Sequence, residues 1–269
     1  MILKFQHFVF FIIAILVASC SSTQNSTKSE TQSKATKENI WVFMLAGQSN
    51  MAGRGQVEAE DTITNSRIIT IDSLGKWKLA SEPLHFYEPN LVGLDCGLSF
   101  GKKLLSTVPD SVTIALIPCA VGGSTIGQWI NDEEHRNVNL LSNFNEKVAI
   151  AKEKGIVKGI LWHQGESDAY PDLISVYKAN LDTLFTEFRS IVGNESLPIM
   201  AAQLGSFFPD QESWDALNTE IEKYTAEDPN THLIRTHDLT HKGDSLHFSS
   251  ASLRGLGQRF AKKYNEIQP

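Results

Sequence analysis

Apolar runs that alternate with helix-like segments are the feature that most constrains the fold of this chain. Six runs rich in β-branched and aliphatic residues span residues 40–47, 67–72, 111–120, 157–165, 197–205 and 231–239. Apolar residues recur every three or four positions, the period of an amphipathic helix, in residues 98–108, 140–155, 173–193, 214–227 and 251–267. Several of the runs lack polar alternation, as is typical of strands that are covered on both faces. The order predicts a mainly parallel sheet with helices on both faces, in a single α/β domain.

The first residues indicate an export signal rather than a part of the fold. Lys4 precedes the apolar run FVFFIIAILVA, which is shorter than a typical transmembrane helix. Small residues and Cys20 follow it, as in an export signal. A cysteine in this position resembles the bacterial lipoprotein signal, in which it becomes the lipidated first residue; an ordinary signal peptide with an incidental cysteine is the alternative. We therefore predict a lipoprotein signal peptide over residues 1–19. The protein is then extracytoplasmic, anchored to a membrane by lipid on Cys20 and located in the periplasm or at the cell surface.

The next segment separates the predicted anchor from the folded domain. Residues 21–38 contain one apolar residue, Ala35, so they cannot bury enough surface to offset the cost of ordering. We predict that residues 20–38 comprise the lipidated cysteine and a flexible tether. The domain then occupies residues 39–269, a length suited to one α/β domain.

Charge and cysteine content narrow the classes of partner. The chain carries 24 basic and 31 acidic residues, a net charge of −7, and shows no basic cluster in the domain, which argues against nucleic acid as a partner. Apart from Cys20, the cysteines are Cys96 and Cys119; export permits a disulfide between them, and two buried free thiols are the alternative. No His or Cys pair has the spacing of a zinc site, so we predict no metal.

Chemically interesting residues follow the predicted strands, where the ligand sites of such sheets lie. The first is Ser49, in the stretch FMLAGQSNMAGRG (43–55) at the end of the first strand. A serine nucleophile needs a base within hydrogen-bond reach and backbone N–H donors for the developing oxyanion, and a tight turn after a strand can supply the donors. A plain turn is the alternative, because Gly, Asn and Ser are common turn residues. Met51 also stands where the G-x-S-x-G elbow has its second glycine.

Two further clusters follow the third and fourth strands. Gly122-Gly123-Ser124 follows the third, and paired glycines allow backbone N–H groups to approach a ligand, although an ordinary loop is the alternative. The stretch WHQGESDA (162–169) ends the fourth and gathers polar groups there, namely His163, Gln164, Glu166 and Asp168. Such a concentration directly after an apolar run favours a functional role over a solvated loop.

An acid and a base occur near the C-terminus. The stretch HKGDSLHFSS (241–250) contains Asp244 and His247. In a loop that leads into a helix, this spacing can set the carboxylate against Nδ1 of the imidazole and leave Nε2 for Ser49. Such a carboxylate fixes the tautomer and stabilises the imidazolium that forms during catalysis. A lone histidine is usually structural, but one that stands three residues after an aspartate is a candidate general base.

Together, these four clusters resemble the SGNH hydrolase superfamily. Within it, GQSNMAGRG, IPCAVGGS, WHQGESDA and DSLHF resemble motifs of the sialate O-acetylesterase domain and of carbohydrate esterase family six, and they span residues 47–248. The resemblance implies a three-layer α/β/α sandwich with a mainly parallel, flavodoxin-like sheet, and no cofactor. It also implies a serine esterase that removes O-acetyl groups from carbohydrates.

The resemblance implies roles for individual residues of these motifs. Ser49 is the expected nucleophile and His247 the expected base. The backbone N–H groups of Ser49 and Gly123 are the expected oxyanion donors, with Gly122 shaping their turn. Gln164 stands where the superfamily has an oxyanion-hole asparagine, so it is the expected third donor.

The supporting acid and the substrate contacts stay open at this point. Asp244 fits the Asp-x-x-His pattern, whereas some members resemble an arrangement in which the Glu of HQGE, here Glu166, supports the histidine. We expect Asp244 and keep Glu166 as the alternative. The expected substrate-binding residues are Gln48, Asn50, Arg54 and Gly122; tying down the nucleophile loop is the alternative role for Arg54.

The resemblance implies a substrate class only in outline. A compact single domain resembles acetylxylan esterases more than the longer sialate esterases, so we expect acetylated xylan or a related polysaccharide. The alternatives are a sialate O-acetylesterase, and a lipase-like or thioesterase member that acts on non-carbohydrate esters. A carbohydrate-binding protein without activity is less consistent with an intact set of Ser49, Asp244 and His247. No obligate protein partner is implied.

Overall fold

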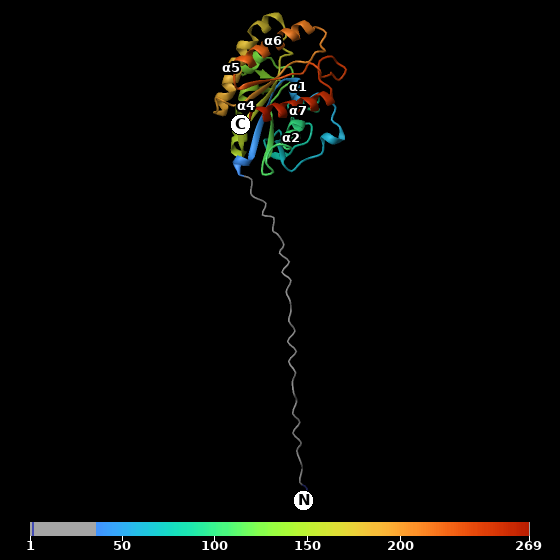
Figure 1. Cartoon of the computed structure of the whole chain (residues 1–269), viewed down its shortest axis with the longest axis vertical. Coiled ribbons are helices and arrows are strands. Elements are labelled where there is room, and N and C mark those ends of the chain that lie inside the picture. Colours follow the sequence, from blue (N-terminus) through green and yellow to red (C-terminus); the bar gives the residue numbers. More distant parts are fainter. Residues whose placement is uncertain (1, 3–35, 269) are drawn as a thin grey trace. The chain divides into compact units, whose positions relative to one another are not determined.

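A seven-stranded sheet forms the centre of the structure, a computed structural model (Figure 1). The strands lie in the order β3-β2-β4-β1-β7-β8-β9, with the bounds β1 (Ile40–Gly47), β2 (Ile68–Ile71), β3 (Trp77–Leu79), β4 (Thr113–Pro118), β7 (Ile156–His163), β8 (Ile199–Ala202) and β9 (Thr231–Ile234). All neighbouring strands are parallel except β2 and β3. Strands β4-β1-β7-β8-β9 have the 2-1-3-4-5 order of flavodoxin-like sheets. The predicted mainly parallel sheet is therefore confirmed, with β2 and β3 added beyond β4.

The structure describes Ile2 and residues 36–268. Residues 36–268 belong to one compact unit, which contains every element discussed below. Apart from Ile2, the predicted signal peptide, Cys20 and the tether up to residue 35 lie outside the described residues. Lys37–Asn39 form a 3-10 turn (η1) directly before β1. In the described part of the chain, no helix is both long enough and apolar enough to span a membrane.

Helices cover both faces of the sheet (Figure 1). One face is covered by α4 (Leu140–Lys154), α5 (Pro171–Val192), α6 (Gln211–Glu227) and the short α3 (Ile126–Ile130). The other face is covered by α2 (Gly97–Leu104), α7 (Ser250–Ile267) and the short α1 (Ser49–Ala52). Alternate residues of β1 serve the two cores, because Val42 and Met44 belong to the first and Phe43 and Leu45 to the second. The predicted three-layer α/β/α architecture is confirmed.

Elements that the hydrophobic pattern does not indicate are all short. They are α1, α3, β3, the 3-10 turns η1 and η2 (Ala59–Asp61) and a hairpin of β5 (Glu134–His135) and β6 (Val138–Asn139). The hairpin turns at Arg136 and Asn137, which both have positive φ (52° and 62°). Such segments contain too few residues for a period to emerge.

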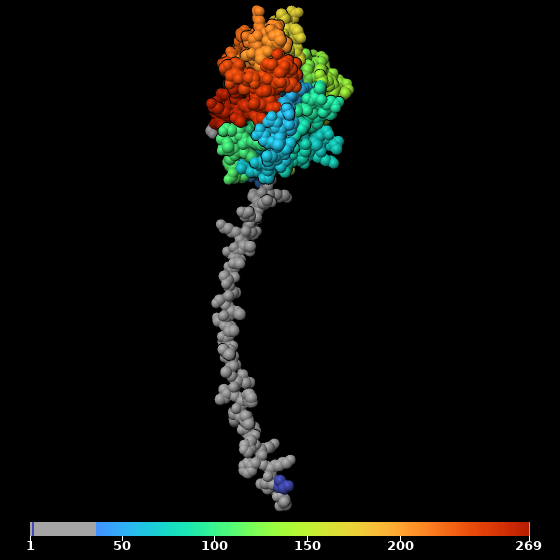
Figure 2. Space-filling view, turned by 90° about the vertical axis from the view of Figure 1, so that its right-hand side faces the viewer, coloured from blue at the N-terminus to red at the C-terminus, as the bar shows by residue number. Residues whose placement is uncertain are grey.

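The last helix joins the C-terminal region to the segment that follows β1. Nε of Arg254 in α7 donates to Oδ1 of Asp61 (2.9 Å), and Oγ of Ser250 donates to the carbonyl oxygen of Gln56 (2.8 Å). Figure 2 shows the red C-terminal region lying against the blue-to-cyan segment of the chain. The loop that precedes α7 is thereby held next to the residues that follow β1.

Cys96 and Cys119 are both buried free thiols. Cys96 belongs to the core on the α2 and α7 side of the sheet, and Cys119 belongs to the core on the opposite side. The sheet separates the two side chains, so the disulfide that export would permit is not formed. Burial raises the pKa of both thiols, which keeps them protonated and unreactive.

Candidate active site

A sharp turn after β1 presents Ser49 at the carboxyl end of the sheet. Gly47, the last residue of β1, has a φ of 136°, and a Cβ there would lie 2.0 Å from the carbonyl oxygen of His163. Only glycine therefore allows β1 and β7 to approach so closely at this point. The N–H of Gln48 donates to the same oxygen (2.9 Å), and Ser49 begins α1. As the first residue of a helix, Ser49 keeps a backbone N–H without an intrahelical acceptor.

Ser49, His247 and Asp244 form one hydrogen-bonded chain. Nε2 of His247 lies 3.1 Å from Oγ of Ser49, and Nδ1 lies 2.8 Å from Oδ2 of Asp244. Partial burial would raise the pKa of Asp244. Hydrogen bonds from the backbone N–H and imidazole of His247 and from the N–H of Leu246 outweigh this effect, so the pKa lies well below its ordinary value. An ionised Asp244 keeps Nδ1 of His247 protonated, so Nε2 is free to accept a proton from Ser49. The structure thus brings together the three residues that the sequence nominates.

Asn50 holds the loop that carries His247. Its Oδ1 accepts the N–H of Phe248 (3.0 Å), and its Nδ2 donates to the carbonyl oxygen of Leu246 (3.3 Å) and to Oε1 of Glu166 (2.6 Å). The residue is only 1% exposed. It therefore clamps the residues on both sides of His247, and the substrate contact expected for Asn50 is not available to it.

His241 supports the same loop from its other end. Its Nδ1 accepts the N–H groups of Gly243 and Ser245, each at 3.0 Å. Oδ1 of Asp244 in turn accepts the N–H of His247 (2.8 Å). These short-range bonds give the loop a fixed shape without regular secondary structure. A position three residues before Asp244 is the only signal for His241 in the sequence.

Glu166 lies apart from His247. Its Oε1 is 3.7 Å from Nδ1 of His163, whose Nε2 donates to the carbonyl oxygen of Gln203 (3.0 Å). Burial lowers the pKa of His163, although the charge of Glu166 opposes this, so the imidazole is neutral. The carboxylate that reaches His247 is that of Asp244. The structure therefore favours Asp244 over Glu166 as the helper acid.

Gln48 and Gln164 belong to a buried amide network. Nε2 of Gln164 donates to three acceptors: Oε1 of Gln48 (3.0 Å), the carbonyl oxygen of Ser124 (3.1 Å) and Oδ2 of Asp168 (2.5 Å). Oε1 of Gln164 accepts a hydrogen bond from the Tyr177 hydroxyl (2.9 Å). Oε1 of Gln48 also accepts two backbone N–H groups of the loop after β7. Gln48 is 3% exposed and Gln164 is fully buried. The expected role of Gln164 as an oxyanion donor is wrong, because both of its amide hydrogens already bind protein acceptors. The expected substrate contact of Gln48 is also wrong, because its side chain is buried in this network.

The turn after β4 offers a second free backbone donor. Gly123 has a φ of 78°, and within residues 36–268 neither its N–H nor that of Ser49 meets a protein acceptor. The N–H of Val121 donates to the carbonyl oxygen of Gly47 (3.2 Å), which ties this turn to the nucleophile turn. Two unpaired N–H groups thus occur at neighbouring strand ends, as an oxyanion hole requires.

Glu88 binds two arginines and the turn after β4. Nη2 of Arg54 (2.8 Å), Nη1 of Arg136 (2.5 Å) and the N–H of Gly122 (2.6 Å) all donate to its carboxylate. The Arg54 side chain is 7% exposed, so the structure supports its alternative role of tying down the nucleophile loop. The N–H of Gly122 is taken by Glu88, so the substrate contact expected for Gly122 is not available through this group. No local motif marks Glu88 or Arg136, because their contacts join segments that are distant in the sequence.

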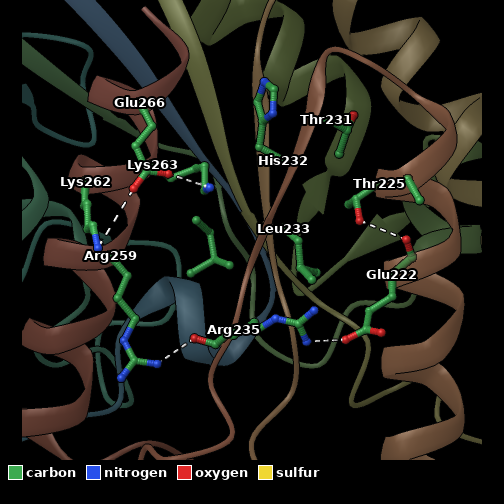
Figure 3. A pocket seen from close by; sticks show the side chains of 12 residues that line it. Glu222, Thr225, Thr231, His232, Leu233, Arg235, Arg259, Lys262, Lys263 and Glu266 are labelled. Atoms are coloured by element: carbon green, nitrogen blue, oxygen red, sulfur yellow. Dashed lines mark hydrogen bonds and ion pairs between the residues drawn. The ribbon is translucent and has the colours of Figure 1, made fainter.

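A hollow of about 660 Å³ lies along β9, between α6 and α7 (Figure 3). Several of its charged side chains pair with one another, for example Arg235 with Glu222 (2.6 Å) and Lys263 with Glu266 (2.6 Å). None of the three residues of the hydrogen-bonded chain lines it. Among residues 36–268, no group of three or more His, Cys, Asp or Glu side chains could hold a metal ion. The hydrogen-bonded chain of Ser49, His247 and Asp244 therefore lies outside this hollow.

Known proteins resemble the chain over nearly its whole described length. The family model for "Carbohydrate esterase, sialic acid-specific acetylesterase" matches residues 39–266. A probable carbohydrate esterase from Arabidopsis thaliana is 29% identical over 266 residues, which cover 91% of this chain and 96% of that protein. The solved structure of the Arabidopsis protein has a TM-score of 0.75 at 27% identity and covers 86% of this chain and 99% of its own. A carbohydrate acetylesterase from Xanthomonas citri shares the fold, with a TM-score of 0.65 at 22% identity over 85% of this chain and 56% of its own.

Proposed function

Because the chain belongs to the carbohydrate esterase family of sialic acid-specific acetylesterases and is a carboxylic ester hydrolase, we propose that it removes O-acetyl groups from carbohydrates through an acetyl-enzyme intermediate on Ser49. The observation that carries this proposal is the chain of contacts from Oγ of Ser49 to Nε2 of His247 (3.1 Å) and from Nδ1 to Asp244 (2.8 Å). A serine is a weak nucleophile unless a base in this position takes its proton.

In the first half-reaction, Oγ of Ser49 attacks the acetyl carbonyl carbon while Nε2 of His247 takes the hydroxyl proton. The carbonyl oxygen becomes an oxyanion, which the free N–H groups of Ser49 and Gly123 stabilise. Asp244 stabilises the imidazolium that forms. The bond between the carbonyl carbon and the sugar oxygen then breaks, and His247 returns its proton to that oxygen. The sugar leaves with a free hydroxyl, and the acetyl group stays on Ser49.

In the second half-reaction, a water molecule takes the place of the sugar. His247 removes a proton from the water as its oxygen attacks the acetyl carbon, and the oxyanion forms again at the same N–H groups. The bond from the acetyl carbon to Oγ breaks, Ser49 regains its proton from His247, and acetic acid leaves. One ester and one water are thereby converted into one alcohol and one acetic acid.

Exposure of the reacting groups supports a bulky carbohydrate as substrate. The side chains of His247 and Asp244 are 16% and 36% exposed, and Ser49 is 7% exposed. A polymer can lie across a site that is open in this way, since only its acetyl group must reach Ser49. We therefore propose acetylated xylan or a related polysaccharide as the substrate. A lipase-like or thioesterase activity is the less favoured alternative.

Acetylated sialic acid is the second candidate substrate. Its carboxylate is a feature that a neutral xylan unit lacks, and a guanidinium is the side chain best suited to bind a carboxylate. Arg136 is 43% exposed, and its Nη2 lies 3.5 Å from the place that a Cβ on Gly123 would occupy. This half-exposed cation beside the proposed oxyanion turn, together with the description of the family, supports the sialate alternative.

The N-terminal segment supports a proposal about location. A signal peptide over residues 1–19 and lipid on Cys20 would anchor the domain to a membrane outside the cytoplasm, with residues 21–38 as the tether. Metabolic labelling with a fatty acid should mark the wild-type full chain and leave Cys20→Ala unlabelled. Equal labelling of this variant would contradict lipid anchoring through Cys20.

The test of the activity is acetate release by the full-length protein from acetylated xylan, acetylated sialic acid and nitrophenyl acetate. Ser49→Ala and His247→Ala should each lower turnover by roughly 10⁴-fold or more. Ser175→Ala, which changes a helix serine outside the site, should leave turnover unchanged. Full activity in Ser49→Ala would overturn the mechanism, and equal rates on the three esters would overturn the preference for xylan. Rates that rise from acetate to longer acyl chains would favour the lipase-like alternative.

A further inference from the structure

Side chains hold the backbone of Gly122 at both its C=O and its N–H. The carbonyl oxygen of Gly122 accepts a hydrogen bond from Nε2 of His135 (2.9 Å). The N–H of Gly122, on the adjoining peptide, donates to Oε2 of Glu88 (2.6 Å). Because C=O and N–H point in opposite directions in a trans peptide, fixing the Gly122 oxygen also fixes the direction of the Gly123 N–H.

The hairpin β5–β6 reinforces both contacts. His135 ends β5, and the next residue, Arg136, donates from Nη1 to Oε1 of Glu88 (2.5 Å). From the other side, Nη2 of Arg54 donates to Oε2 of the same carboxylate (2.8 Å). The Glu88 side chain is 4% exposed, so one buried carboxylate joins the nucleophile loop, the turn after β4 and the hairpin.

Glu88 is ionised, so its carboxylate can hold the two arginines and the N–H of Gly122 together. Burial would raise its pKa, but Arg54, the N–H of Gly122 and Arg136 outweigh this and lower it below the ordinary value. An ionised carboxylate makes shorter and stronger hydrogen bonds to N–H donors than a neutral acceptor does. The space is also closely filled: a Cβ on Gly122 would lie 2.1 Å from Nη2 of Arg54 and 2.6 Å from Oε2 of Glu88.

We propose that His135 and Glu88 are positioning residues that aim the Gly123 N–H at the oxyanion. The His135 bond also polarises the peptide whose N–H is the donor, and hydrogen bonds linked in this way strengthen one another. Within residues 36–268, neither side chain hydrogen-bonds to Ser49 or His247, and both contact the backbone of Gly122. The inference rests on the proposed function, because it assumes that Gly123 supplies an oxyanion donor.

The test uses full-length His135→Ala and Glu88→Gln with nitrophenyl acetate as substrate. Each should lower kcat by about tenfold or more, less than the loss of a whole oxyanion donor, and leave KM within about twofold. His135→Gln should recover part of the loss, because an amide can also donate to the Gly122 oxygen. Phenylboronic acid, which adds to Oγ of Ser49 as a tetrahedral adduct, should lose affinity by the same factor as kcat/KM.

A matched control separates positioning from general loosening. Asp228→Asn removes a carboxylate from another partly buried ion pair, with Arg189 (2.8 Å), at the amino-terminal end of β9. It should lower the melting temperature but leave kcat and boronate affinity unchanged. Wild-type kcat and boronate affinity in both His135→Ala and Glu88→Gln would overturn the inference, as would an equal kcat loss in Asp228→Asn. Activity in Ser49→Ala would instead overturn the proposed function itself.

Discussion

Nδ1 of His247 lies 2.8 Å from Oδ2 of Asp244, and the second oxygen of this carboxylate accepts the N–H of His247 itself (2.8 Å). One acid therefore fixes both the backbone and the ring of the same histidine. This arrangement needs only the three-residue spacing within the loop. It leaves Nε2 directed at Oγ of Ser49, 3.1 Å away.

Asp244→Asn should reduce kcat far more than Glu166→Gln. An asparagine can present an N–H to Nδ1 and so favour the wrong tautomer, which costs roughly 10³- to 10⁴-fold in serine hydrolases. Glu166 touches Asn50 rather than His247, so its amide variant should lose about tenfold or less. Steady-state kinetics with nitrophenyl acetate measure both variants, with circular dichroism as the control for folding. A larger loss in Glu166→Gln would make Glu166 the helper acid.

Gly122→Ala and Gly123→Ala should differ sharply although the residues are neighbours. At Gly122 the new methyl group would meet Nη2 of Arg54 at 2.1 Å, so the buried pair with Glu88 must break, and we expect kcat to fall by about 10²-fold. At Gly123 the nearest atom is 3.5 Å away, and the cost is the strain of a positive φ, about 1–2 kcal/mol. Kinetics and urea unfolding of both variants provide the comparison. Equal kcat in the two variants would contradict the crowding at Gly122.

Gln164→Glu tests whether this side chain supports the structure rather than the oxyanion. A glutamate would place a carboxylate against Oε1 of Gln48, the Ser124 carbonyl and Asp168, where the amide now donates. Because an unpaired buried charge is costly, we expect a loss of about 3 kcal/mol or more in the free energy of unfolding. Gln258→Glu, at an exposed position of α7, should change stability by less than about 0.5 kcal/mol. A stable but inactive Gln164→Glu variant would restore the oxyanion role.

The parts of the site that the sequence predicts are those set by local spacing. Asp244 and His247 meet because they share one loop, and Ser49 stands on a sharp turn at the carboxyl end of the sheet because Gly47 ends β1. The order of apolar and amphipathic segments likewise indicates the sheet and its two helical layers, since periodicity reports which faces are buried.

Contacts between distant segments are the parts that the sequence does not predict. Glu88 and His135 meet at Gly122 only after β4, the hairpin and the nucleophile loop have come together. Gln48 and Asn50 stand on either side of Ser49, so their position suggests substrate binding. In the structure their side chains turn inward instead, and this direction depends on tertiary packing rather than on sequence distance.

We expect Glu82 to make the stability of the folded chain depend on pH, independently of catalysis. It is buried, its Oε2 accepts the N–H of Leu84 (3.2 Å), and Asp95 lies nearby in a fully buried pair with His85 (2.8 Å). Within the described residues, Oε1 of Glu82 has no hydrogen-bond partner. Burial and the charge of Asp95 raise the pKa of Glu82 well above its ordinary value, so the folded chain keeps a proton that the unfolded chain loses above about pH 4.3.

The sign of the effect follows from proton binding. Between the unfolded and the folded pKa of Glu82, the unfolded state binds fewer protons, so stability falls as pH rises, by about 1.4 kcal/mol per pH unit. Glu82→Gln does not titrate, so its stability relative to wild type should improve by that amount per unit from pH 5 upward, until the folded pKa is passed. Urea unfolding at several pH values measures the difference, with the exposed Glu195→Gln as a control that should run parallel to wild type. If the free energy of unfolding of Glu82→Gln changed with pH in parallel with that of wild type, Glu82 would be ionised in the folded chain. The proposed pH dependence would then be wrong.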